Sequence, residues 1–111
     1  MLPQENRLNP NQFKTLYNQG RKIRGEYGML LTLRNNERGF RIGFVVSKKI
    51  GNAVQRHRMT RLLREITKKY IKEINNIDAI YIAYKYCNEY QPLYKDFDKQ
   101  IKTAISNTKE S

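Results

Sequence analysis

The sequence has a single cysteine, no long apolar run and few acidic residues. Because Cys87 has no second cysteine to pair with, the chain can form neither an internal disulfide nor a cysteine-based zinc cage. No apolar stretch approaches the roughly 20 residues that a membrane-spanning helix needs. Residues 1–7 lack the apolar core of a signal peptide. These absences predict a cytoplasmic protein with no membrane partner and no metal site of its own.

The shortage of acids leaves a strong positive charge. The chain carries 22 Lys and Arg against 10 Asp and Glu, which gives +12 at pH 7. Such an excess indicates a polyanionic partner. Nucleic acid is favoured, with an anionic membrane surface or a merely solvated basic surface as alternatives. The length of 111 residues and the 8 Tyr and 4 Phe predict one domain, 1–111, with an ordered core at about 7–107.

Residue patterns predict an α+β fold with the order α-β-β-α-β-α. Asn9 and Pro10 suit the cap and first position of a helix that stops near Gly20. The remaining elements are expected at Tyr27–Leu33 and Arg41–Val46 (strands, paired as a hairpin), Ala53–Asn75 (helix), Asp78–Tyr86 (strand), and a closing helix through Leu93, Phe97, Ile101 and Ile105. The helix at 53–75 is long enough to join two parallel strands in a small mixed sheet.

The predicted helix at 53–75 has an apolar arc and a cationic arc when wound at about 100° per residue. The apolar arc holds Met59, Leu62, Leu63, Ile66, Tyr70 and Ile74, and the cationic arc holds Arg58, Arg61, Arg64, Lys68 and Lys72, with His57 among them. Glu65 is the one acid between Lys48 and Lys72, and we expect it to pair with Arg61 or Lys69. Solvated helix faces usually alternate charge signs, so this arc favours an external anion over plain solvation. Gly51 either admits a ligand backbone or simply makes a turn.

The segment from Ser47 to Glu65 resembles the signature of the bacterial ribonuclease P protein subunit. It contains Lys48-Lys49, then Gly51-Asn52-Ala53-Val54, then Arg56-His57-Arg58 where that family has Arg-Asn-Arg. Asn6-Arg7-Leu8 and Arg41-Ile42-Gly43 fit the same family. The resemblance implies an α-β-β-α-β-α sandwich with a left-handed βαβ crossover, whereas general rules favour a right-handed one.

The resemblance also implies a function. In that family RNA is the catalyst, and Mg²⁺ held by ribonuclease P RNA hydrolyses precursor tRNA to release its 5′ leader. The protein is then an accessory subunit without catalytic side chains, and its partners are ribonuclease P RNA and precursor tRNA. Carried over, the RNA-subunit contacts are Lys48, Lys49, Asn52, Arg56, His57, Arg58, Arg61, Arg64 and Lys68. The leader contacts are Phe13, Tyr17 and Leu31.

Two positions depart from the family. His57 replaces an asparagine but can still donate a hydrogen bond to RNA; we reject it as a general base because no second histidine and no acid is placed to act with it. Leu31 stands where an aromatic is usual, and Tyr27 is a possible substitute. Phe13 and Tyr17 could stack on leader bases or simply pack in the core.

Three other functions fit the sequence less well. A general RNA-binding module would share the basic helix but not the signature from Ser47 to Glu65. A DNA regulator needs a helix-turn-helix, yet strands precede this basic helix. A self-sufficient nuclease lacks a set of catalytic residues.

Overall fold

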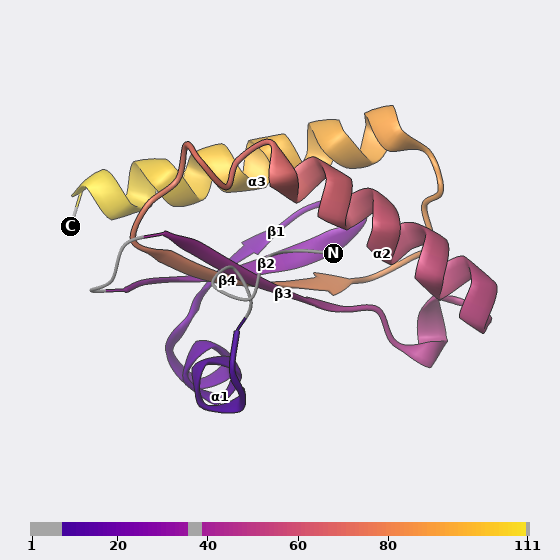
Figure 1. The fold of residues 1–111 in the computed structure, drawn as a ribbon, viewed down its shortest axis with the longest axis horizontal. Helices are drawn as coiled ribbons and strands as arrows, with labels where there is room; N and C mark the ends of the chain where they lie inside the picture. The colour runs from indigo at the N-terminus through magenta and orange to yellow at the C-terminus, as the bar shows by residue number, and fades with distance from the viewer. Residues whose placement is uncertain (1–7, 36–38, 111) are drawn as a thin grey trace.

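The computed structural model describes residues 8–35 and 39–110. Its elements are α1 (Pro10–Gln19), β1 (Arg21–Arg24), β2 (Gly28–Arg34), β3 (Phe40–Val45), the short helix η2 (Lys48–Ile50), α2 (Ala53–Lys68), β4 (Ile77–Ala83) and α3 (Tyr90–Glu110). The sheet forms a middle layer, with α1 on one face and α2 and α3 on the other (Figure 1). The predicted α+β class is therefore confirmed. The Asn6-Arg7 part of the family pattern and residues 36–38 of the predicted turn lie outside the described residues.

The sheet is mixed, with the strand order β1-β2-β4-β3. β2 pairs antiparallel with β1 and with β4, while β3 and β4 pair in parallel across the α2 crossover. The parallel pair was predicted, but the hairpin between the strands now seen as β2 and β3 was wrong, because β4 lies between them. Alternating apolar residues show which face of a strand is buried and do not show which strands are neighbours. The left hand of the crossover stays a prediction of the resemblance.

Two further elements differ from the sequence prediction. β1 was missed because Ile23 is its one apolar residue, so the strand shows almost no alternation and forms by pairing with β2. α2 ends at Lys68 and not near Asn75. Tighter turns follow, in which the Tyr70 N–H donates to the Thr67 carbonyl at 2.9 Å. Tyr70 and Ile74 nevertheless stay buried, as the apolar arc predicted.

The core lies on both faces of the sheet, but unequally. The larger cluster fills the space between the sheet and the α2–α3 layer and includes Phe40, Met59, Leu63, Tyr81 and Phe97, each fully buried. The smaller cluster, between the sheet and α1, has Leu16, Leu31 and Ile80 as its buried members. Because β4 is central, its alternate residues supply both clusters.

The aspartates of the described chain hold elements together. Asp96 in α3 accepts hydrogen bonds from the backbone N–H groups of Glu26 and Tyr27, both at 2.9 Å, and so ties the β1–β2 turn to the helix. Asp78 in β4 accepts from the Arg41 Nε at 2.7 Å within the sheet. These carboxylates are therefore committed to the fold.

Candidate nucleic-acid interface

The start of α2 is fixed by a reciprocal cap. The Asn52 side chain accepts from the Gln55 N–H at 2.9 Å, and the Gln55 side chain accepts from the Asn52 N–H at 3.0 Å. Gly51, with φ of 157°, makes room for this cap, because a Cβ there would collide with Gln55 Oε1. The group that packs closely against Gly51 is thus the Gln55 side chain of the protein's own helix cap. The cap fixes the register of α2, and with it the direction in which each following arginine points.

The two arcs predicted for α2 are present. Met59, Leu63 and Ile66 are fully buried on one side of the helix, while Arg58 and Arg61 are exposed on the other. The predicted RNA-subunit contacts that are exposed are Lys48, Lys49, Asn52, His57, Arg58, Arg61 and Lys68, and those that are partly exposed are Arg56 and Arg64. We call these nine residues the basic surface. η2 contributes its two lysines while its Ile50 is buried, which holds them next to the helix entry.

The arginines of the basic surface are not neutralised by the protein. Within residues 8–35 and 39–110, ion pairs join Arg41 to Asp78, Lys85 to Glu26 and Lys102 to Asp98, and none of them involves α2. The expected pairing of Glu65 with Arg61 or Lys69 is therefore wrong. Lys69 instead lies over the rings of Tyr90 and Tyr94, with its Nζ 5.0 Å and 4.6 Å from their centroids. The guanidinium groups of α2 are free to bind an external anion.

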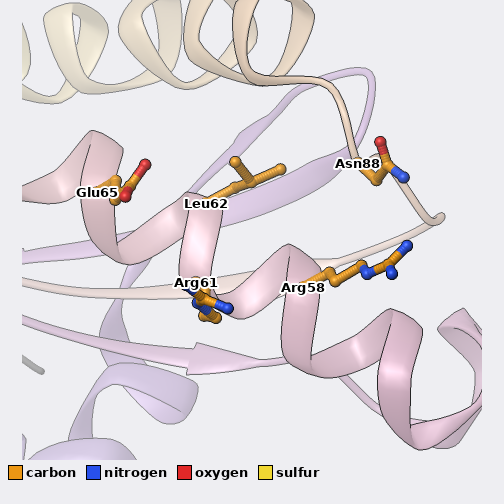
Figure 2. A pocket seen from close by; sticks show the side chains of 5 residues that line it. All are labelled: Arg58, Arg61, Leu62, Glu65 and Asn88. Carbon is orange, nitrogen blue, oxygen red and sulfur yellow. The ribbon is translucent and has the colours of Figure 1, made fainter.

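A hollow lies between α2 and the loop that joins β4 to α3 (Figure 2). Its volume is about 300 Å³, and it is lined by Arg58, Arg61, Leu62, Glu65 and Asn88. Arg58 and Asn88 extend from opposite elements at the same end of the hollow, and Leu62 points from α2 toward the loop. Sequence reasoning missed Asn88, because Asn88 belongs to a loop that only the fold brings beside α2.

The three predicted leader contacts differ in how far their side chains are exposed. Tyr17 is 49% exposed on α1. Phe13, one turn earlier, is partly buried and packs against Gly43 of β3, where an added Cβ would lie 3.0 Å from two of its ring carbons. Leu31 is 1% exposed in the cluster beneath α1. Its side chain does not reach the surface, which contradicts the predicted leader contact at Leu31.

Tyr27 does not replace Leu31 on the α1 side. It packs against the cluster on the other face of the sheet, and Lys85 Nζ lies 5.1 Å from its ring centroid. Burial is the main cause that raises the pKa of the Tyr27 hydroxyl, and the nearby carboxylate of Glu26 raises it further. The α1 face therefore offers one well-exposed aromatic, Tyr17, beside the half-covered ring of Phe13.

The described residues contain no group of three or more His, Cys, Asp or Glu that could hold a metal ion. His57 is exposed, and none of the described carboxylates forms an ion pair with it. No helix in the described part of the chain is long and apolar enough to cross a membrane. What the site offers chemically is a set of unpaired cations on a rigid helix.

Comparisons with known proteins agree with the signature in α2. Residues 2–109 match the family model described as Ribonuclease P. The ribonuclease P protein component of Fusobacterium nucleatum is 38% identical over 101 residues, covering 88% of this chain and 91% of that protein. That of Alkaliphilus metalliredigens is 33% identical and covers 97% of both. A Staphylococcus aureus RNase P protein mutant with defective mRNA degradation activity superposes with a TM-score of 0.80 at 29% identity, over 91% of this chain and 89% of the other.

Proposed function

The chain belongs to the ribonuclease P protein family, and we propose from this that it is the protein subunit of ribonuclease P. In that role it binds ribonuclease P RNA and the 5′ leader of precursor tRNA in the cytoplasm. It assists an endonucleolytic cleavage that the RNA catalyses. The observation that carries the proposal is the basic surface of α2, whose exposed arginines have no acidic partner among the described residues.

The basic surface would bind the RNA subunit mainly through phosphates. Arginine presents a planar fork that can grip two phosphate oxygens at once. Each such contact releases condensed counterions, which makes binding strongly dependent on salt. Met59, Leu63 and Ile66 hold the opposite side of α2 against the core. The arginines therefore approach RNA on a helix that is already ordered, and the helix backbone loses little conformational freedom on binding. His57 lies in the first turns of the same helix and would add a hydrogen bond.

The leader would lie on the other side of the sheet, against α1. Tyr17 exposes an aromatic ring there, and Phe13 extends the apolar surface toward β3. Aromatic stacking tolerates any base, which suits leaders of differing sequence. Binding energy gathered on the leader is remote from the scissile bond and absent from the mature product, so it favours precursor over product.

The residues of the chain contribute by binding and positioning. Mg²⁺ held by the RNA subunit would supply the Lewis acid and the activated water for hydrolysis. The protein's cations would lower the repulsion between two polyanions as catalyst and substrate approach.

Reconstitution tests this function. The chain is mixed with ribonuclease P RNA and a precursor tRNA labelled at its 5′ end, at a magnesium concentration too low for the RNA alone to act well. We expect the chain to stimulate release of the leader. Vigorous magnesium-dependent cleavage by the protein without the RNA would refute the accessory role. RNA binding without any stimulation would favour a general RNA-binding module.

A further inference from the structure

We propose that the hollow beside α2 holds one unpaired nucleotide of the bound RNA, with Glu65 accepting from the edge of its base at one end of the hollow and Asn88 contacting the nucleotide from the other end. The inference rests on the proposed function and adds to it a contact that depends on base identity. At about 300 Å³ the hollow is at the small end of ligand sites, a size suited to one nucleotide. It lies on the exposed side of α2, so RNA bound to the basic surface would pass over it.

The lining of the hollow differs from that of a phosphate site. Glu65 is the one acid between Lys48 and Lys72, and it is exposed with no ion pair to any described residue. A free carboxylate repels phosphate, so a surface built for the backbone alone would gain nothing from it. A carboxylate does accept hydrogen bonds from the amino and ring N–H groups of a base edge, such as the amino group of cytosine.

The other lining residues complete a nucleotide site. Leu62 is partly buried and packs on the core with one side, which leaves an apolar floor for a base. Asn88 faces it from the loop and can both donate and accept. Buried Cys87 donates from its Sγ to the Glu89 carbonyl at 3.5 Å and so holds the loop next to Asn88. Arg58 and Arg61 flank the hollow, where they can bind the neighbouring phosphates or stack on the base.

Glu65→Gln separates a base contact from general electrostatics. The substitution removes a negative charge, so charge alone predicts tighter binding to ribonuclease P RNA. A carboxylate that accepts from a base predicts weaker binding, by about fivefold or more, because hydrogen bonds to charged groups are strong. Glu73→Gln is the matched control, since Glu73 is an exposed acid in the turns after α2. We expect that control to bind as tightly as the wild type or more tightly.

Three further measurements define the outcome. Asn88→Ala should weaken binding while Asn75→Ala, at an exposed asparagine away from the hollow, should not. The slope of log affinity against log salt should be unchanged in Glu65→Gln, because no phosphate contact is lost. Chemical probing should show one unpaired nucleotide whose base edge is protected by the wild type and stays reactive with Glu65→Ala, which removes the acceptor altogether.

The inference is overturned if Glu65→Gln binds the RNA as tightly as Glu73→Gln does, or if no base edge depends on Glu65 for protection. Either result would leave the basic surface intact as a phosphate-binding surface. Failure of the wild-type chain itself to bind ribonuclease P RNA in a salt-dependent way would instead refute the proposed function.

Discussion

Replacing Arg58 and Arg61 together by alanine should weaken RNA binding without harming the fold. Both side chains are exposed on α2, and neither forms an ion pair with a described residue. Alanine is the best helix former, and the change also relieves repulsion between neighbouring guanidinium groups. We therefore expect the free energy of unfolding to change by no more than about 0.5 kcal/mol.

The loss in affinity can be worked out from counterion release. Each phosphate contact contributes about 0.7–0.9 to the slope of log affinity against log salt, so two lost contacts lower that slope by about 1.5. If the contribution of these two contacts to log affinity vanishes near about 1 M salt, that contribution amounts to roughly 1.2 logarithmic units at about 0.15 M salt. The double variant should thus bind ribonuclease P RNA more than about tenfold more weakly at physiological salt, and the deficit should shrink as salt rises.

Filter binding or fluorescence anisotropy over a salt series measures both quantities. The matched control is Lys95→Ala with Lys99→Ala, which removes two exposed cations from α3, outside the basic surface. We expect the control to keep most of the wild-type slope. An unchanged affinity of the arginine variant at physiological salt, with the fold intact by circular dichroism, would refute the assignment of α2 as the RNA-binding element.

Two other predictions concern α1 and α3. Gly43→Ala should push the Phe13 ring off β3. The difference in binding free energy between precursor and mature tRNA, measured with the reconstituted enzyme, should then fall by up to about 1 kcal/mol. An equal loss of affinity for both RNAs would contradict a leader contact. Burial opposes the charged Asp98 carboxylate, but hydrogen bonds from Lys102 and Tyr70 outweigh it and hold the pKa of Asp98 below its usual value. Its stabilising effect is therefore present above the unfolded-state pKa of about 4 and is lost as the pH falls through the lower folded-state pKa. Urea denaturation should show that Tyr70→Phe lowers the free energy of unfolding at neutral pH and lowers it less in acid. An equal loss at both pH values would count against stabilisation of the charged Asp98 carboxylate by Tyr70.

The features predicted correctly from the sequence are those that depend on neighbouring residues in the chain. Asn9 and Pro10 mark the start of α1, where the Gln12 N–H does donate to the Asn9 side chain at 2.9 Å. The two arcs of α2 follow from the helical repeat alone, and so does the burial of Met59 and Leu63. Both features depend on residues within a few positions of one another, which is why one sequence suffices to find them.

Features that depend on distant partners were missed. β1 has the residues of an exposed loop and is a strand because Ile23 pairs with Leu30. The neighbours of β4 are decided by packing on both of its faces, which periodicity does not encode. The hollow needs Asn88, which lies more than twenty positions from the other lining residues in the chain. Leu31 was matched to a surface contact by family position, and its burial under α1 depends on the packing of that helix.

The placement of the acids explains how a chain of net charge +12 leaves its arginines available. Asp78 is bound by Arg41, Asp96 by two backbone N–H groups, and Asp98 by Tyr70 and Lys102. Each aspartate lies in β4 or α3, so the carboxylates that stabilise the fold are kept away from the basic surface. Glu65 is then the exception that requires a reason. An unpaired acid in the same hollow as Arg58 and Arg61 lowers the affinity for phosphate. That cost is offset if the Glu65 carboxylate accepts hydrogen bonds from a base, which is why the sign of the Glu65→Gln effect is decisive.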